Sequence, residues 1–281
     1  NTPAALWDCV VISAILSNYN GAKYLAEALE SVMRQEPVDH EFIVIDDGST
    51  DESREIITDF CERYPERIQA IFHEENRGQA AGFNTGFAAA SGDVICFMDS
   101  DDVWFPNKLR QLAHFVAWNP GNAVYQHNMY RMVRGAVTAG KFHWTLPTGD
   151  LLSQVKSTRS VPHFMPTSAL AMPRHVLEKV MPIPEQFRIC ADGYLTRTCF
   201  CFGEVASTND CWGAYRIHDE NSTFDNPHWD NAHYANRLLI PTLNQFYRDQ
   251  GIDLQFREIR FGGRHAPRNW EKRLGDFLRR F

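Results

Sequence analysis

A chain of 281 residues, of which 44% are hydrophobic, is long enough for one large α/β domain with a sizeable core. Its formal net charge of −7 argues against nucleic acid as the main partner. Even the apolar run at residues 10–16 stops at a polar turn, well short of the roughly 18 residues that a membrane-spanning helix needs, so insertion into a bilayer is not expected.

The first 130 residues alternate strand-like runs with amphipathic stretches, which predicts an α/β fold with a mostly parallel central sheet flanked by helices. The predicted strands are residues 10–16, 41–45, 68–72, 93–98 and 123–127. Predicted helices cover residues 25–33, 80–90 and 106–118, and a capping box at residues 49–52 opens another that runs through Phe60.

After Gly135 this alternation loosens, because prolines break the chain into short pieces. We predict a main domain over residues 1–220, with a nucleotide-binding half at about 8–130 and a looser acceptor half at about 131–220. Residues 221–281 are expected to form a helical extension. Its last 25 residues carry a local charge of +5, which leaves −12 on the preceding 256.

The seven cysteines are scattered and have no metal-ligand spacing, so we expect free thiols in a reducing compartment. This favours a cytoplasmic location. Because the first residue is Asn rather than Met, the native N-terminus and any targeting signal can lie outside this sequence.

Three polar clusters follow predicted strands directly, at residues 17–20, 46–51 and 99–102. In open parallel sheets, ligands bind in the crevice beyond the carboxyl ends of the strands, so these clusters are expected to converge there. Asp99, Asp101 and Asp102 crowd three carboxylates into four residues, which favours a hard divalent ion such as Mg²⁺ or Mn²⁺. The alternative is a solvated turn that caps the helix near Pro106.

The order and spacing of several motifs resemble the family 2 glycosyltransferases, which have the GT-A fold, over roughly residues 10–220. The segments that carry the resemblance are 17–20, 29–35, 42–51, 76–78, 82–86 and 90–102, followed by Trp104, Pro106, Lys108 and Leu109. The resemblance implies an inverting transfer of a sugar from a nucleotide-diphosphate donor to a hydroxyl of a glycan or lipid-linked acceptor. It favours a UDP-sugar as the donor.

Carried over by position, the resemblance also implies donor-site roles. Ser17 and Tyr19 would line the nucleobase pocket, and Asp47 would accept a hydrogen bond from a base N–H. Arg77 would support the base or phosphates. Asp101 would ligate the metal, with Asp99 near the ribose or behind the metal. For Asp47, a turn residue before the predicted cap is the alternative.

Downstream, Asp192 matches the position of the family's catalytic base, which removes the proton of the acceptor hydroxyl. The family often has a more acidic stretch here, whereas this chain has Ala191 and Gly193 beside Asp192, and a plain N-cap aspartate is the alternative. Arg216 and His218 lie in a segment similar to one that closes over the diphosphate, where they suit phosphate charge and metal coordination.

Residues on the acceptor side are less clearly marked. By resemblance, Thr167 and Ser168 are expected near the acceptor, and His143 with Trp144 either stacks on a sugar or packs in the core. His228 and His233 have no familiar metal-site spacing, which favours an ordinary polar loop.

Apolar residues recur at helical spacing among the basic residues of segment 266–281. Three placements are open for such a basic amphipathic helix: contact with the inner face of an anionic membrane, packing against its own domain, which we favour, or continuation into a segment outside this sequence.

Two other functions fit parts of the sequence. Residues 99–103 match the D-x-D-x-V nucleophile motif of haloacid-dehalogenase-like phosphatases, although that motif normally lies early in a chain. A non-catalytic relative that binds nucleotide or glycan is the third possibility, and the intact acidic residues argue against it.

Overall fold

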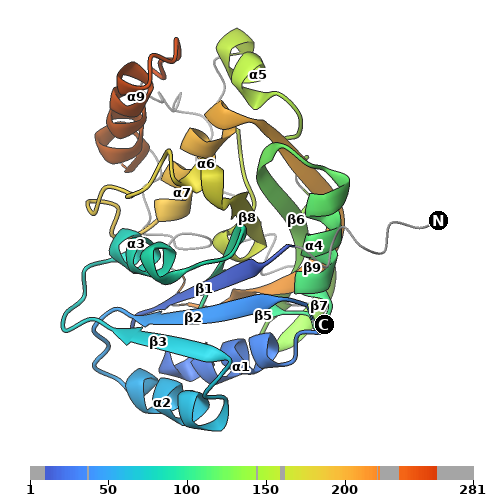
Figure 1. Cartoon of the computed structure of the whole chain (residues 1–281), viewed down its shortest axis with the longest axis vertical. Coiled ribbons are helices and arrows are strands. Elements are labelled where there is room, and N and C mark those ends of the chain that lie inside the picture. Colours follow the sequence, from blue (N-terminus) through green and yellow to red (C-terminus); the bar gives the residue numbers. More distant parts are fainter. Residues whose placement is uncertain are drawn as a thin grey trace.

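The computed structural model describes residues 10–36, 38–143, 145–158, 162–219, 221 and 234–257. Within this part of the chain, nine strands form one mixed sheet (Figure 1), in the order β3-β2-β1-β4-β8-β6-β9-β5, with β7 paired to β6. The predicted mostly parallel α/β architecture is confirmed for the first half. The second half extends the sheet with antiparallel pairings.

The parallel half of the sheet follows the predicted alternation closely. Its strands are β1 (Ile12–Asn18), β2 (His40–Asp46), β3 (Ile68–Phe72) and β4 (Val94–Asp99). The connecting helices are α1 (Ala22–Met33), α2 (Ser53–Arg63) and α3 (Gln79–Ala89). In the register of the sheet, Ser17 lies between Ile45 and Asp99, so the polar clusters after β1, β2 and β4 share one edge.

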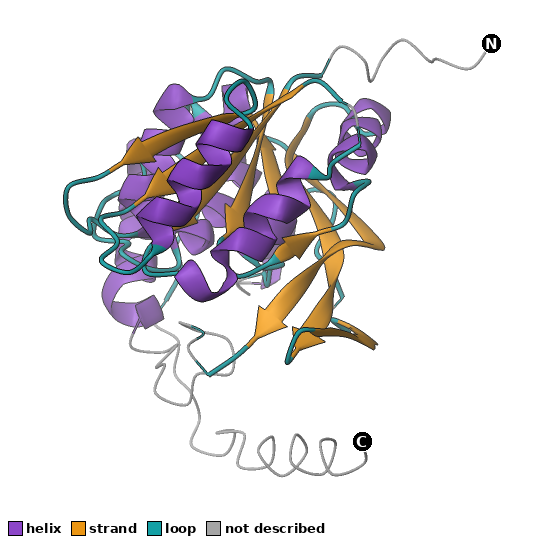
Figure 2. Cartoon of the chain, turned by 90° about the horizontal axis from the view of Figure 1, so that it is seen from below, coloured by secondary structure: helices purple, strands orange, loops and turns teal. Residues whose placement is uncertain are grey.

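Alternate side chains of these strands enter two different cores. Ile15, Ile95 and Phe97 face the layer that contains α3, whereas Leu16, Val44 and Met98 face α1 and α2. Figure 2 shows helices on both faces of the strands. Strands buried on both faces read as continuous apolar runs, which is why the sequence marked them clearly.

The predicted capping box at residues 49–52 is wrong. Helix α2 begins at Ser53 without a side-chain cap. Ser49 Oγ instead accepts a hydrogen bond from the Asn20 backbone N–H at 2.9 Å. One carboxylate oxygen of Asp51 accepts from Ser53 N at 3.1 Å and the other from Ala22 N at 3.0 Å, so Asp51 serves the starts of both α1 and α2.

The second half adds the remaining strands of the same sheet and further helices. Its elements are β5 (Val103–Trp104), α4 (Lys108–Trp118), β6 (Asn122–Val133), β7 (Ala136–Lys141), α5 (Leu151–Thr158), β8 (Leu170–Pro173), α6 (Arg174–Leu177), α7 (Ala191–Cys199), β9 (Glu204–Ile217) and α9 (Ile240–Asp249). Short 3-10 turns at Thr167–Ala169 and Phe200–Phe202 precede β8 and β9, and a π-helical turn at Ala235–Leu239 leads into α9. Strand β6 extends well beyond the predicted residues 123–127 because it pairs with β7, β8 and β9.

Residues 234–257 are not packed as a separate unit. Leu239, Leu243 and Tyr247 join the core on the α3 side of the sheet, and the Tyr247 hydroxyl donates to Arg197 O in α7 at 2.8 Å. Among the described residues, no helix is long and apolar enough to cross a membrane. Trp144, His228, His233 and the basic segment 266–281 lie outside the described residues.

Candidate functional site

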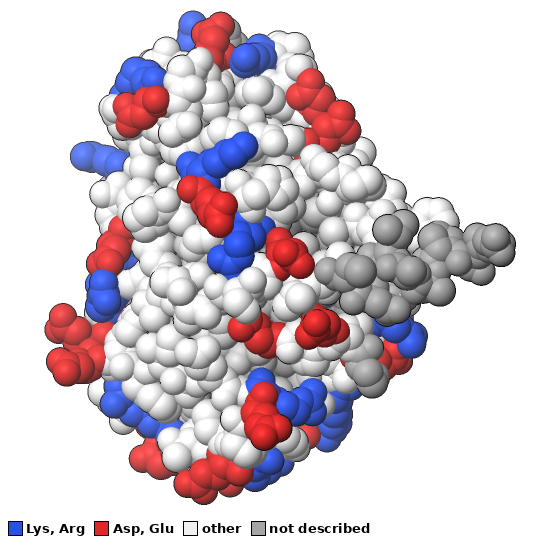
Figure 3. Space-filling model, in the orientation of Figure 1, with Lys and Arg blue, Asp and Glu red and all other residues white. Residues whose placement is uncertain are grey.

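A cavity of about 630 Å³ opens at the carboxyl ends of β1, β2 and β4. It brings together most of the side chains that the sequence singled out. The predicted site residues that line it are Ser17, Tyr19, Asp47, Asp99, Asp101, Thr167, Asp192 and His218. On the face shown in Figure 3, acidic and basic side chains are interspersed over the described surface.

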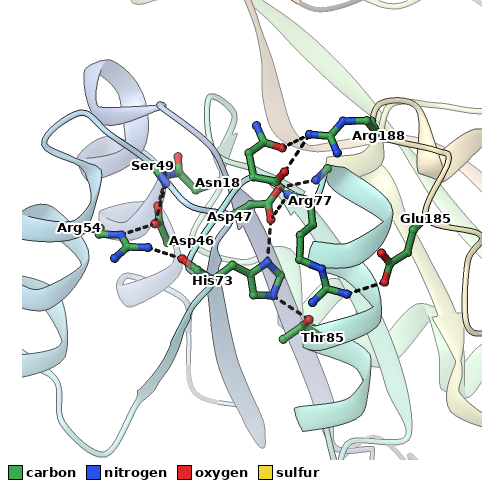
Figure 4. A network of polar contacts seen from close by, with 12 residues as sticks. Asn18, Asp46, Asp47, Ser49, Arg54, His73, Arg77, Thr85, Glu185 and Arg188 are labelled. Carbon is green, nitrogen blue, oxygen red and sulfur yellow. Dashed lines mark hydrogen bonds and ion pairs between the residues drawn. The ribbon is translucent and has the colours of Figure 1, made fainter.

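Asp47 is held by a dense network at the end of β2 (Figure 4). One carboxylate oxygen accepts from His73 Nδ1 at 2.7 Å and from Arg77 N at 3.0 Å. The other accepts from Gly78 N at 2.6 Å and from Arg77 N at 3.2 Å. Asp47 is only 2% exposed, so its charge chiefly fixes the loop at residues 76–78. The alternative for Asp47, a turn residue before a cap at Ser49, is wrong because Ser49 does not cap α2.

The charge of the neighbouring Asp46 is balanced by an ion pair and by hydrogen-bond donors of the protein. It is fully buried, and its carboxylate lies 3.0 Å from Arg54 Nε. Asn18 Nδ2 and Ser49 N donate to the same carboxylate at 3.1 Å each. The acidic pair after β2 is therefore supplied with donors from the chain itself.

The two arginines near this network point in different directions. The guanidinium of Arg77, which was expected at the donor, pairs with Glu185 at 2.6 Å on the exposed surface, and Arg77 does not line the cavity. Arg188 does line it, with one guanidinium nitrogen bonded to Asn76 O at 3.0 Å and to Asn76 Oδ1 at 2.7 Å. The sequence missed Arg188 because no motif surrounds it.

The acidic residues after β4 are supplied with fewer donors. Asp99 is partly buried and accepts from Gln79 Nε2 at 3.3 Å and from the Thr167 hydroxyl. Burial raises the pKa of Asp99 well above its usual range, and the charges of Asp101 and Asp192 raise it further. Such a cluster of like charges favours a bound cation.

Asp102 has a structural position in this cluster. It is fully buried, and burial raises its pKa well above the usual range, with further contributions from Asp101 and Asp99. One of its oxygens accepts from Arg216 N at 2.9 Å. Asp102 thereby ties the end of β9 to the acidic turn, as a side chain in the core and not as a solvated turn residue.

Asp101 and His218 form the corner of the cavity that fits a metal. Asp101 Oδ2 lies 2.9 Å from His218 Nε2, and both residues face the cavity. The described residues contain no cluster of three His, Cys, Asp or Glu ligands, so a divalent ion here would need oxygens from a diphosphate and water. One carboxylate and one imidazole fit Mg²⁺ or Mn²⁺ on that condition.

Arg216 was expected to contact the donor phosphates, but its guanidinium lies behind this corner. It donates to Asp101 O and to Glu27 at 2.6 Å each, and its side chain is 5% exposed. Its charged group also lies 4.7 Å from the centre of the Tyr24 ring, which in turn packs against His218. In this arrangement Arg216 supports Asp101 and His218 from outside the cavity lining.

Asp192 is the second residue of α7 and faces the same cavity. The cap position belongs to Cys190, so the alternative of a plain N-cap aspartate is wrong. Burial raises the pKa of Asp192, while the charge of Arg197 and the backbone N–H groups of the first turn oppose that rise. A partly buried carboxylate with a raised pKa is suited to accept a proton from a substrate hydroxyl.

The predicted acceptor-side pair is split by the structure. Thr167 lines the cavity, whereas Ser168 is fully buried and its hydroxyl accepts from Asp99 N at 3.0 Å. Phe164, Met165 and Ile189 complete an apolar wall beside Thr167, which the sequence did not mark. These residues come from irregular segments, where local pattern says little about direction.

Comparison with known proteins gives a consistent picture. A family model described as glycosyl transferase family 2 matches residues 13–181. An uncharacterized glycosyltransferase of Nostoc sp. (strain PCC 7120) is 40% identical over 217 residues, which cover 75% of this chain and 66% of the relative. A second one, from Rickettsia bellii, is 33% identical over 224 residues, covering 77% of this chain and 30% of the relative. The chain thus spans less than two thirds of either relative.

One similar protein carries a specific name. The Escherichia coli UDP-Glc:alpha-D-GlcNAc-diphosphoundecaprenol beta-1,3-glucosyltransferase WfgD is 31% identical over 135 residues, which cover 48% of this chain and 51% of that protein.

Solved structures show the same fold at low identity. Residues 1–349 of S. aureus TarS have a TM-score of 0.64 at 20% identity, covering 87% of this chain and 66% of that fragment. For the complex of the same fragment with UDP-GlcNAc, the TM-score is 0.60 at 20% identity, and the match covers 84% of this chain and 72% of that fragment. The Pyrobaculum calidifontis mannosyltransferase PcManGT, in complex with GDP-Man and Mn²⁺, has a TM-score of 0.56 at 18% identity, covering 88% and 65%.

Proposed function

Because this chain belongs to glycosyl transferase family 2, we propose that it moves a sugar from a UDP-sugar to a hydroxyl group of a glycan or lipid-linked acceptor, with inversion at the anomeric carbon. The observation that carries the proposal is that the pair Asp101 and His218 lines the same cavity as Asp192. The charges of Asp101 and Asp192 both act on Asp99, which lines this cavity as well. The family assignment replaces the phosphatase hypothesis for Asp99 and Asp101.

The donor is expected to lie across the ends of β1, β2 and β4. Tyr19, which is 48% exposed at the cavity, is available to stack on the nucleobase, and Ser17 lines the same end. Asp47 organises the loop that borders this end. The names of WfgD and of the TarS complex favour UDP, whereas PcManGT was solved with GDP-Man.

Asp101 and His218 would hold the Mg²⁺ or Mn²⁺ ion, which when bound supplies positive charge that stabilises the leaving diphosphate. Arg216 donates to the backbone carbonyl of Asp101, and the Tyr24 ring packs against the His218 ring, so both residues are supported from behind. The Mn²⁺ in the PcManGT complex supports a divalent ion in this fold.

Asp192 would act as the general base. Its carboxylate accepts the proton of the acceptor hydroxyl as that oxygen bonds to the anomeric carbon, while the bond from this carbon to the diphosphate breaks and UDP leaves. Phe164, Met165 and Ile189 supply apolar surface in the same cavity, against which an acceptor could pack. The diphosphoundecaprenol in the name of WfgD favours a lipid-linked acceptor, and peripheral membrane contact by segment 266–281 stays a prediction.

The proposal is tested by thermal stabilisation with UDP, GDP, UDP-glucose and UDP-GlcNAc, each with and without Mn²⁺. We expect a Mn²⁺-dependent shift with the uridine ligands that Asp101→Asn removes. Asp192→Asn should abolish sugar transfer and leave the shift nearly intact, and Asp210→Asn, an exposed carboxylate on β9, should change neither. No Mn²⁺-dependent shift with any ligand would contradict the proposal, and loss of donor binding in Asp192→Asn would indicate a structural role.

A further inference from the structure

The segment that leads into α7 is docked on the N-terminus of α3. Gln79 N donates to Arg188 O at 2.8 Å and Ala80 N donates to Phe187 O at 3.1 Å, so two N–H groups of the first turn of α3 are satisfied from this segment. Gly78 allows the approach, because with its φ of +95° an added Cβ would lie 2.5 Å from the Arg188 Cα. Residues 187–191 are therefore placed by α3.

The Gln79 side chain continues this contact into the cavity. Its Oε1 accepts from Ala191 N, the first residue of α7, at 2.8 Å. Its Nε2 donates to Asp99 Oδ1 at 3.3 Å. One neutral side chain thus joins the carboxylate at the end of β4 to the turn of α7 that carries Asp192.

This link connects two groups that repel each other. Asp99 and Asp192 are close enough for the charge of one to act on the other, and both face the cavity. A lysine or arginine at position 79 would neutralise part of the charge that the metal corner uses, whereas an amide donates to one group and accepts from the other without adding charge. On the other side of this turn, the Tyr234 hydroxyl donates to Cys190 O, just before α7, at 2.9 Å.

We infer that Gln79 is a positioning residue for sugar transfer, which sets the general base Asp192 relative to the donor-side carboxylate Asp99. The inference rests on the proposed role of Asp192. Gln79 acts through the start of α7 and does not take part in proton transfer. A displacement of about 1 Å in a catalytic group can lower the rate by about 100-fold, so a single bridging amide is sufficient to matter.

The first test measures hydrogen exchange of the full chain and does not depend on activity. In Gln79→Ala, the Ala191 N–H loses its acceptor, so exchange in a peptide covering residues 190–194 should become at least about tenfold faster. Gln79→Glu keeps an acceptor for Ala191 N and should exchange like wild type. Gln186→Ala is the matched control, because that exposed glutamine lies in the same region and donates to the Thr242 hydroxyl at 3.0 Å. Unchanged exchange in Gln79→Ala overturns the inference.

The second test measures UDP release from UDP-glucose and UDP-GlcNAc, together with UDP binding in the presence of Mn²⁺. Gln79→Ala should lower kcat by about 10- to 100-fold with the UDP Kd changed by less than about twofold. Gln79→Glu should also lower kcat, because it cannot donate to Asp99. Full turnover in Gln79→Ala overturns the inference, as does a loss of UDP affinity that accounts for the whole effect. A wild-type chain that binds no uridine nucleotide contradicts the proposed function instead, while the exchange result still decides what Gln79 holds.

Discussion

The strands β2 and β4 both end in adjacent acidic residues, and the two groups differ in how their charge is balanced. After β2, Asp46 pairs with Arg54 and Asp47 accepts from His73 and two backbone N–H groups. After β4, the charges of Asp99 and Asp101 act on each other with few donors nearby. The charge of the first group is balanced by donors from the chain itself, whereas the second group has the charge balance that a positively charged ligand would complete under the proposed function.

The largest expected effect is on stability at the β2 end. Asp47→Ala removes the acceptor of Arg77 N, Gly78 N and His73 Nδ1, so we expect the free energy of unfolding to fall by about 3 kcal/mol. Asp47→Asn keeps one acceptor oxygen and should lose less. Urea denaturation measures both, and a wild-type midpoint for Asp47→Ala would show that this network is not structural.

The buried side chain of Lys108 shows how the protein accommodates a basic group. Lys108 Nζ lies 2.7 Å from His127 Nε2 and 4.5 Å from the centre of the Trp104 ring, and burial lowers the pKa of Lys108 to about 8. Its unfolded pKa is near 10.5, so between these values the unfolded chain binds more protons and stability rises with pH.

Lys108→Met should remove this contribution. From pH 8 to pH 10, the unfolding free energy of wild type should rise relative to that of the variant by about 2 kcal/mol. Urea denaturation of both proteins at the two pH values gives the difference and cancels the ionisation of other groups. Parallel pH profiles would mean that Lys108 is not held in an unfavourable charged state.

Arg188 and Arg77 differ in the same way, because Arg188 lines the cavity and Arg77 does not. Arg188→Ala should weaken UDP binding about tenfold, because a guanidinium that lines the cavity is lost. Arg77→Ala should have a smaller effect, since that side chain pairs with Glu185 at the surface. Calorimetric titration with UDP measures both, and the reverse order would restore the role that the motif implied for Arg77.

The smallest effect has the opposite sign to that at Asp47. Asp99→Asn removes one of the mutually repelling charges after β4, so without metal we expect the protein to gain about 1 kcal/mol, or roughly 2–4 °C in Tm. Exposed Asp93→Asn, at the start of β4, is a control for the removal of charge alone. A lower Tm for Asp99→Asn would mean that Gln79 and Thr167 already compensate the charge.

Much of the donor half could be predicted because its signals are local. An apolar run buried on both faces, followed at once by carboxylates, identifies a strand end of the sheet without knowledge of its neighbours. This is how Asp47, Asp99 and Asp101 were placed at one edge, which the register of β1, β2 and β4 confirms. The prediction of the capping box was wrong because it also used local spacing alone. Ser49 has the spacing of a cap, but its hydroxyl accepts a hydrogen bond from Asn20 N in another loop.

The acceptor half depended on contacts between segments far apart in the chain. Strand β8 is four residues long and β9 pairs with β5 and β6, so neither has a pattern that stands out by itself. The same holds for Ser168, for which the family resemblance suggested an acceptor contact but whose hydroxyl accepts a hydrogen bond from Asp99 N in the core.

The amino-acid sequence by itself determined which carboxylates end which strands, because alternation and burial act over a few neighbouring residues. Only the tertiary structure decided which groups each carboxylate contacts. The donors that satisfy Asp47, the arginine that faces the cavity and the amide of Gln79 beside Ala191 all come from distant segments. Side-chain direction is set by such packing, and a single sequence motif does not predict it.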